Sequence, residues 1–98
     1  MTDDLDPIIH PAHRLRICAL LAAGTTVELA IVKEHCGLSA SALSKQVSAL
    51  VDAGYVDQQR SRTDSRRIWL SLTHEGKTAY RRHVHALRAL LANSEASI

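Results

Sequence analysis

Aromatic residues are scarce in this sequence: among 98 residues there are two Tyr, one Trp and no Phe. Because 46% of the residues are nevertheless hydrophobic, the core must be built from aliphatic side chains. Two cysteines are too few for a disulfide framework, so a reducing compartment is expected. No repeated, proline-rich or glycine-rich segment is present, and the composition is that of an ordinary globular domain.

The sequence also lacks long hydrophobic runs and a signal segment. The longest apolar run, 17–23, has seven residues, whereas ~20 are needed to span a bilayer. The N-terminus contains Asp3, Asp4 and Asp6 and no preceding basic residue, unlike a secretory signal. We therefore expect a cytoplasmic protein without membrane contact. A chain of this length forms one small domain, and small domains often gain stability by oligomerising, which is the first indication of a homodimer.

Charge is distributed unevenly, although the formal net charge is only +2. The first ten residues contain three Asp and no Lys or Arg, whereas residues 60–67 contain four Arg and one Asp. A basic cluster of this kind in a small domain indicates a polyanionic partner, usually nucleic acid. A solvated, turn-rich loop is the alternative interpretation of the same cluster.

Hydrophobic periodicity predicts three helices, a β-hairpin and a long final helix. Gly24, Gly37 and Gly54 are expected to end the first three helices, and Ser39 and Thr73 to cap the third and the last. The first helix is expected over 10–23, the second over 27–35, the third over 40–53, the strands over 55–60 and 68–72, and the last helix over 73–92. A frayed acidic tail, 1–9, and a short tail, 93–98, would flank a single domain, 10–92.

The third predicted helix has two contrasting faces. Its apolar residues recur at helical spacing and are expected to face the core: Leu43, Val47, Leu50 and Val51. The opposite side carries three short hydroxyl side chains and one cation: Ser41, Ser44, Lys45 and Ser48. Short side chains let the helix backbone approach another surface closely, which suits insertion into a DNA major groove ~12 Å wide.

Both cysteines fall on apolar helix faces. Cys18 lies within the first predicted helix and Cys36 at the end of the second. Because free cysteine is among the most buried residue types, core packing is expected for both, with redox sensing by Cys36 as the alternative.

Six histidines are many for this length, but their spacing does not predict a metal site. His10 and His13 begin the first helix, and His83 and His85 point to different sides of the last one. No Cys-x-Cys or His-x3-His pair is present, and Zn²⁺ requires four converging ligands. Solvated histidines, or histidines that contact phosphate, are expected, and no cofactor is predicted. No catalytic motif is present either, so an enzyme is not expected.

The order helix, helix, helix, hairpin, helix resembles the winged helix-turn-helix transcriptional regulators of the MarR-like and ArsR-like bacterial and archaeal families. Residues 38–47, Asp52-Ala53-Gly54-Tyr55-Val56 and the arginines of 62–67 are similar to their recognition helix, following strand and wing. Leu72-Thr73-His74-Glu75-Gly76-Lys77 is similar to the L-T-x-x-G-[KR] start of their last helix, and 13–17 to their P-x-R-x-x-I region. The resemblance covers about residues 10–91 and is best with short regulators that contain little beyond the DNA-binding domain.

The implied fold is α+β and mostly α, with a three-helix core, a two-stranded β wing and a long C-terminal helix. The resemblance implies a homodimeric regulator that binds specific duplex DNA sequences, with the third helix, 39–53, in the major groove and the arginine-rich wing, 60–67, at the minor groove or backbone. The matching DNA-contact positions are Ser39, Ala40, Ser41, Ser44, Lys45, Gln46, Ser48, Arg62, Arg66 and Arg67, with Gln46 nearer the core side. Because the family dimerises through its first and last helices, the expected interface contains Leu15, Tyr80, Val84, Leu87, Leu90 and Leu91.

The predicted recognition face departs from a typical base-reading surface. It has no Arg, Asn or Gln at its centre for bidentate base contacts, so specificity would rest on DNA shape, the wing and the dimer spacing. Two alternatives stay open. One is an ArsR-like repressor that responds to metal or thiol oxidation, and the other is a winged-helix protein-interaction module that does not bind DNA. No operator or effector can be named from the sequence.

Overall fold

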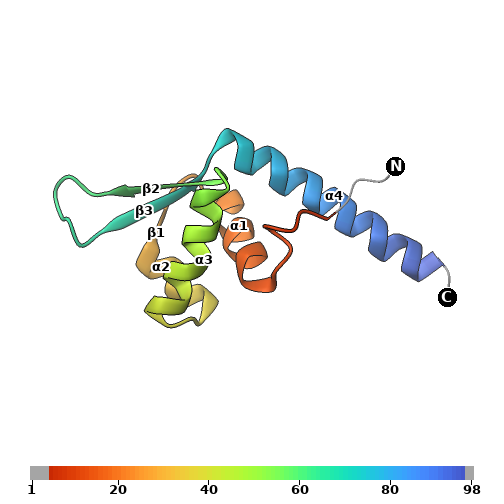
Figure 1. Ribbon diagram of the computed structural model, residues 1–98, viewed down its shortest axis with the longest axis horizontal. Helices are drawn as coiled ribbons and strands as arrows, with labels where there is room; N and C mark the ends of the chain where they lie inside the picture. The colour runs from red at the N-terminus through yellow and green to blue at the C-terminus, as the bar shows by residue number, and fades with distance from the viewer. Residues whose placement is uncertain (1–4, 97–98) are drawn as a thin grey trace.

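The computed structural model describes residues 5–96 of the chain. Three helices form a bundle, from which a β-hairpin and the last helix project in opposite directions (Figure 1). This arrangement gives the molecule an elongated shape of 53 × 26 × 21 Å. The elements are α1 (Ala12–Ala23), β1 (Val27–Glu28), α2 (Leu29–Cys36), α3 (Ala40–Asp52), β2 (Val56–Arg60), β3 (Ile68–Leu72) and α4 (His74–Ala96). The predicted mostly helical α+β class, with a three-helix core, a wing and a long last helix, is confirmed.

The sheet has three antiparallel strands in the order β1-β3-β2, not the two that were predicted. Val27 pairs with Leu70 and Glu28 with Trp69, so α2 begins two residues later than expected. A strand of two residues is too short to show the alternation of apolar and polar residues by which strands are predicted. Only the pairing with β3 makes these two residues a strand. The hairpin itself follows the prediction closely, because β2 and β3 pair in register from Val56–Leu72 to Arg60–Ile68.

Local sequence signals set most helix ends. The Ser39 hydroxyl accepts a hydrogen bond from the backbone N–H of Ala42 at 3.2 Å and caps α3. The Thr73 hydroxyl accepts one from Gly76 at 2.9 Å and caps α4. Gly37 ends α2 in the left-handed conformation, with φ of 66°. Pro11 precedes the first residue of α1, so this helix begins two residues later than predicted.

The core is aliphatic, as expected, and lies between the three-helix bundle and the sheet. Both cysteines are buried in it. The prediction that Val51 faces the core is wrong, because 37% of this residue is exposed. Val51 lies about 80° around α3 from Leu43, at the edge of the buried face. The buried residues of this cluster are Ile9, Ile17, Cys18, Leu21, Val32, Cys36, Leu43, Val47, Leu50, Val56, Leu70 and Leu72.

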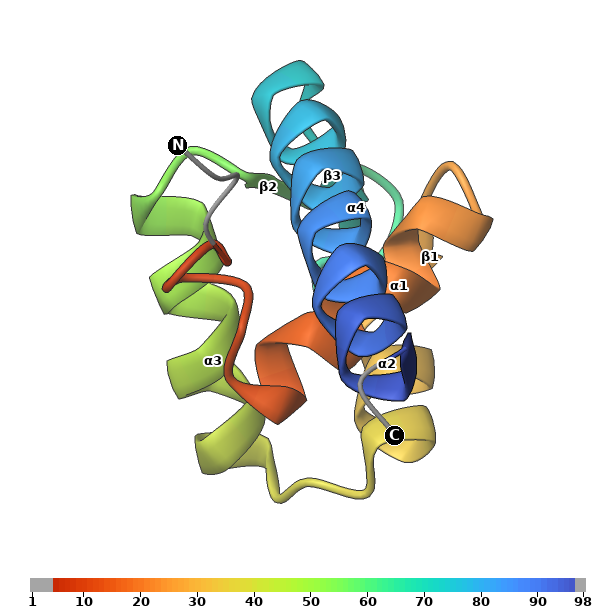
Figure 2. The ribbon, with the colours of Figure 1, turned by 90° about the vertical axis from the view of Figure 1, so that its right-hand side faces the viewer.

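The predicted frayed tail 1–9 is wrong for residues 5–9, while residues 1–4 lie outside the described part of the chain. Residues 5–10, which we name the N-terminal strap, run between α3 and α4 (Figure 2). Ile9 is fully buried, and Asp6 makes hydrogen bonds to His83 in α4 and to Tyr55, just beyond the end of α3. The sequence suggested a solvated tail because the partners of Asp6 are distant in the chain.

The last helix is longer than predicted. It continues to Ala96, four residues past the expected end, because no Gly or Pro interrupts 92–96. Residues 93–96 of the predicted tail are therefore helical, and 97–98 lie outside the described residues. Among residues 5–96, no helix is both long and apolar enough to cross a membrane.

Candidate nucleic-acid interface

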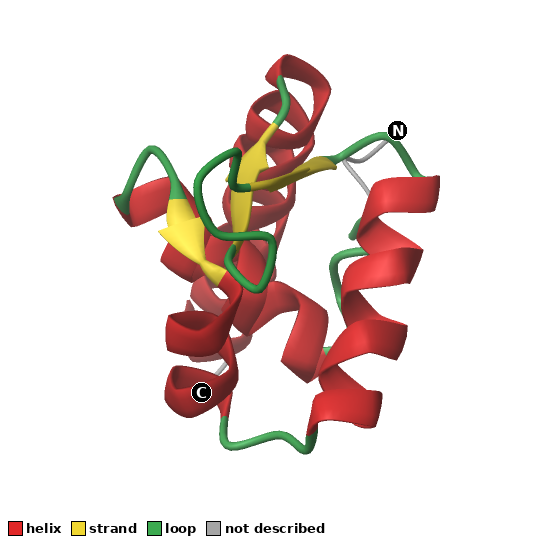
Figure 3. Cartoon of the chain, turned by 90° about the vertical axis from the view of Figure 1, so that its left-hand side faces the viewer, coloured by secondary structure: helices red, strands yellow, loops and turns green. Residues whose placement is uncertain are grey.

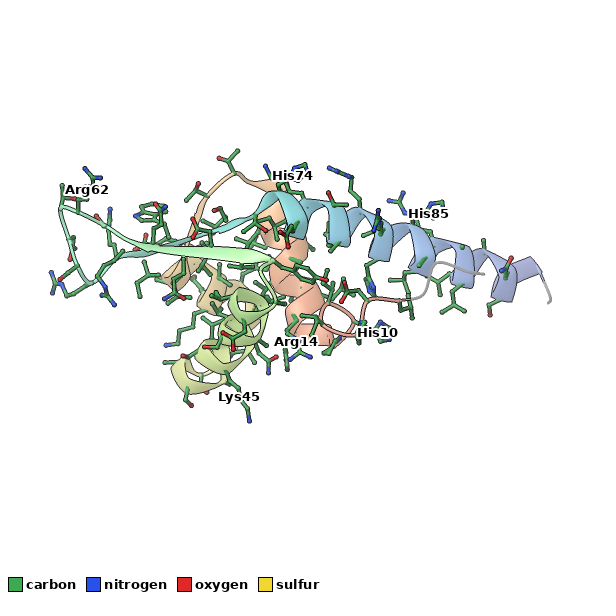
Figure 4. The ribbon with its side chains drawn as sticks, turned by 45° about the horizontal axis from the view of Figure 1, so that its top comes forward. His10, Arg14, Lys45, Arg62, His74 and His85 are labelled. Carbon is green, nitrogen blue, oxygen red and sulfur yellow. The ribbon has the colours of Figure 1, made fainter. Side chains whose placement is uncertain are left out.

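The outward face of α3 carries the predicted DNA-contact residues. Ser44 and Ser48 are exposed on the side of the helix away from the core. Lys45 is also exposed and points away from the body of the molecule (Figure 4). The face therefore combines small side chains with one cation, which is the composition that the sequence predicted for it.

The N-terminus of α3 adds backbone donors to this face. Ser39, Ala40 and Ser41 are exposed, and the hydroxyls of Ser39 and Ser41 are 3.4 Å apart. The free N–H groups of a first helical turn and the helix dipole favour a phosphate there. Ser39 therefore caps the helix at an exposed helix N-terminus.

Gln46 lies apart from the other predicted contact residues. It is half-buried, and its Oε1 accepts a hydrogen bond from Nη1 of Arg14 at 3.2 Å. Nε of Arg14 also donates to the carbonyl oxygen of Ile8 at 2.6 Å. The Gln46 amide is therefore directed toward α1 and the N-terminal strap, and not toward the outward face.

The wing loop, 61–67, is held by its own polar side chains. The Ser61 hydroxyl accepts hydrogen bonds from the N–H groups of Thr63 and Asp64, both at 3.3 Å. Asp64 Oδ1 accepts from the N–H of Arg66 at 3.0 Å. The one acidic residue of the basic cluster therefore shapes the turn that presents the arginines.

The wing arginines differ in how far they are already engaged. Arg62 lies at the tip of the loop and extends into solvent (Figure 4). The Arg66 side chain is 91% exposed, with its Nε 3.4 Å from Asp64 Oδ1. Arg67 Nε lies 3.6 Å from Oε2 of Glu28, a partner contributed by β1. Exposed ion pairs of this kind are weak, so Arg62 and Arg66 are the cations most available to a polyanion.

A hollow of about 260 Å³ connects α3 to the wing. Ala40 and Ser44 border it from α3, Arg66 from the wing and Lys33 from α2. Figure 3 shows this side of the molecule, with the hairpin loop in front and α3 to its right. Lys33 is a cation that the sequence analysis missed, because only the fold brings α2 beside the recognition face.

The predicted dimer residues lie along one side of α4 and on α1. Leu15, Tyr80, Val84 and Leu87 are half-buried, and the first two also pack against the core of their own domain. Leu90 and Leu91 are 53% and 54% exposed on the projecting part of α4.

The two thiols are poorly suited to redox sensing. Burial raises the pKa of Cys18 to about 12, and the nearby Asp6 carboxylate contributes to the same shift. Burial also raises the pKa of Cys36, although Arg16 opposes this change. Because the thiolate is the reactive form, neither side chain is activated for oxidation.

The histidines are not all solvated, which corrects the expectation from the sequence. His83 is fully buried on the core side of α4, and its Nδ1 accepts a hydrogen bond from the N–H of Asp6 at 2.9 Å. Within residues 5–96, no group of three His, Cys, Asp or Glu side chains is arranged to hold a metal ion.

Comparisons with known proteins agree with this geometry. The transcriptional regulator PcaV from Streptomyces coelicolor, solved in complex with its natural ligand, is 26% identical with a TM-score of 0.80, over 96% of this chain and 66% of PcaV. A transcriptional regulator homologue from Pyrococcus horikoshii OT3 is 20% identical with a TM-score of 0.83, over 88% of this chain and 86% of that one. YusO from Bacillus subtilis is 20% identical with a TM-score of 0.79, over 98% of this chain and 64% of YusO. No curated protein sequence matches the chain.

A family model also matches most of the chain. Residues 13–91 match the model of winged helix DNA-binding domains, which includes α1, α2, α3, the wing and most of α4. The resemblance to MarR-like regulators that the sequence indicated is confirmed. The chain spans just under two thirds of the length of PcaV and of YusO. Over residues 13–91 it belongs to the winged helix DNA-binding domain family.

Proposed function

We propose that the protein acts as a homodimer that binds specific duplex DNA sequences, with α3 in the major groove and the wing arginines at the neighbouring minor groove or backbone. The observation that carries this proposal is the common location of the exposed cations. Arg66 and Lys33 border the hollow beside α3, and Lys45 is exposed next to Ser44, which borders it too. Arg62 extends from the tip of the same hairpin as Arg66 (Figure 4). As a transcriptional regulator of this kind, the protein would have the cytoplasmic location that the sequence predicted and would associate with the nucleoid when bound to DNA.

The exposed cations and the groove-contacting residues of α3 would contribute differently to binding. The cations neutralise phosphates and supply most of the affinity, whereas groove contacts set the register on the duplex. The serines of α3 make few discriminating base contacts, so sequence preference would come from groove shape at the wing and from the spacing of two half-sites about one helical turn apart.

The affinity should depend steeply on salt concentration. If a dimer neutralises about six to eight phosphates, log K should fall with log salt with a slope of roughly −5 to −7. Fluorescence anisotropy of a labelled duplex between 50 and 300 mM NaCl would measure the slope. A slope near zero, or no binding by folded protein, would contradict the proposal and favour the protein-interaction module.

The dimer is proposed to form along α4. Replacing Leu90 and Leu91 together with Glu should shift the protein to monomer, because the two exposed apolar side chains would become charges in an apolar contact. Sedimentation equilibrium would measure this shift, and circular dichroism should show an unchanged fold because both residues are exposed. Ala89→Glu, at an exposed position on another side of α4, is the matched control and should leave the dimer intact. A double variant that stays dimeric would exclude this interface.

A further inference from the structure

The N-terminal strap joins α4 to the recognition helix through Asp6. The backbone N–H of Asp6 donates to Nδ1 of His83 in α4 at 2.9 Å. Its carboxylate Oδ2 accepts a hydrogen bond from the hydroxyl of Tyr55, which follows α3, at 2.8 Å. Its Oδ1 accepts from the N–H groups of Ile8 and Ile9, at 2.8 and 3.2 Å. Asp6, which lies outside the secondary structure, therefore connects α4 to the segment that directly follows α3, and the strap runs between the two helices (Figure 2).

A second connection reaches the middle of α3. Arg14 donates through Nε to the carbonyl oxygen of Ile8 and through Nη1 to Oε1 of Gln46. The strap is thus tied to the recognition helix at Gln46, and just beyond its end at Tyr55. A change in the position of the strap would therefore be transmitted to α3.

Packing alone does not explain a histidine at position 83. Because Nδ1 accepts a hydrogen bond, the neutral ring carries its proton on Nε2. Nε2 is buried and has no hydrogen-bond partner among residues 5–96. An unsatisfied buried donor destabilises the fold, a cost that an aliphatic side chain would avoid.

We propose that Asp6 and His83 are positioning residues for DNA binding: their hydrogen bond fixes α3 relative to α4, and it opens when His83 binds a proton. The inference rests on the proposed function, because in a dimer held together by α4 the orientation of α3 relative to α4 sets the distance between the two recognition helices. Since that distance must match the spacing of the half-sites, opening the contact weakens binding.

The charges around His83 determine the direction of the pH dependence. Burial lowers the pKa of His83, and so does the His10 ring, whose centroid is 5.4 Å away, while Asp6 opposes both effects. Tyr55 remains a neutral donor, because its hydrogen bond to Asp6 raises its pKa to about 12. Cys18, in α1, also stays neutral.

The folded protein therefore contains His83 with a neutral ring, and the hydrogen bond between Asp6 and His83 is intact above the ordinary histidine pKa of 6.5. As the pH falls below this value, protonation of Nδ1 sets two donors, Nδ1–H and the Asp6 N–H, against each other. The hydrogen bond is then lost and the strap is released from α4.

The first test compares DNA affinity at pH 7.5 and 5.5, using the duplex that wild-type protein binds most tightly. Wild-type affinity should fall by about fivefold or more on acidification. His83→Asn retains an acceptor near the position of Nδ1 but cannot be protonated. Because protonation at position 83 is then no longer coupled to DNA binding, the affinity of this variant should change by less than about twofold between the two pH values. His74→Asn, at an exposed position of α4, is the matched control and should keep the wild-type pH dependence. Equal pH dependence in wild type and His83→Asn would overturn the proposal.

The second test needs neither DNA nor a His83 variant. In wild-type protein, NMR should show the His83 ring titrating over the same pH range in which the Asp6 amide loses protection from hydrogen exchange. An Asp6 amide that stays protected while the ring titrates would overturn the proposal, even if His83→Asn fails to fold. Absence of DNA binding at pH 7.5 would instead contradict the proposed function, and the NMR result would still decide whether the contact opens.

Discussion

Removing the side chains of Lys45, Arg62 and Arg66 together should weaken DNA binding by about a thousandfold at 0.15 M salt. A dimer would lose six cations from one surface, and each phosphate contact contributes to the release of condensed counterions. The salt slope should become shallower by about five, since each of the six lost contacts reduces it by about 0.9. The triple alanine variant should keep its fold, because all three side chains are exposed.

A matched variant separates this surface effect from net charge. Alanine at Lys77, Arg82 and Arg88 removes the same three charges from exposed positions on α4. This control should lower the affinity by much less than the first variant does. It weakens the long-range attraction between protein and DNA but leaves the phosphate contacts of α3 and the wing in place. Electrophoretic mobility shifts at several salt concentrations would compare the two variants. Equal losses would mean that the α3 and wing surface is not where DNA binds.

Replacing Gly76 with alanine should destabilise the domain by about 3 kcal/mol or more, although alanine normally favours a helix by ~1 kcal/mol. A Cβ atom at this position would overlap the backbone of Tyr55, including its carbonyl group. The clash falls where the N–H of Thr73 donates to the Tyr55 carbonyl at 3.0 Å, so the start of α4 would separate from the hairpin. For a domain of this size, such a loss lowers Tm by roughly 12–24 °C.

Gly24 provides the control for this prediction. Its backbone is extended, and a Cβ there would meet only Val27 Cγ2 at 3.4 Å, an ordinary contact. Gly24→Ala should therefore leave Tm within a few degrees of wild type. Thermal unfolding followed by circular dichroism would measure both variants. A Gly76→Ala protein that melts with wild type would show that α4 can shift away from Tyr55 at little cost.

The features predictable from sequence were those encoded locally. The two faces of α3 follow from helical spacing around Leu43 and Val47, and the β3 boundaries from the alternation of Ile68, Leu70 and Leu72. The Ser39 and Thr73 caps depend on residues only three positions apart. The family resemblance added the position of the wing, which residue patterns alone presented only as a basic hairpin.

The features that were missed depend on contacts between residues far apart in the chain. The β1 strand exists only because Val27 and Glu28 pair with β3. The strap is ordered because Asp6 reaches Tyr55 and His83, and the latter lies 77 residues away. Local hydrophobicity and spacing carry no information about such partners, so the polar N-terminus suggested a tail and the histidine a solvated side chain.

Selection of bound sequences from a random duplex DNA library, at near-physiological salt, tests the central claim most directly. We expect enrichment of an inverted repeat whose half-sites lie about one helical turn apart, because two α3 helices related by two-fold symmetry would read them. Enrichment of a single half-site would contradict the dimer. No enrichment by protein shown to be folded would contradict sequence-specific DNA binding itself.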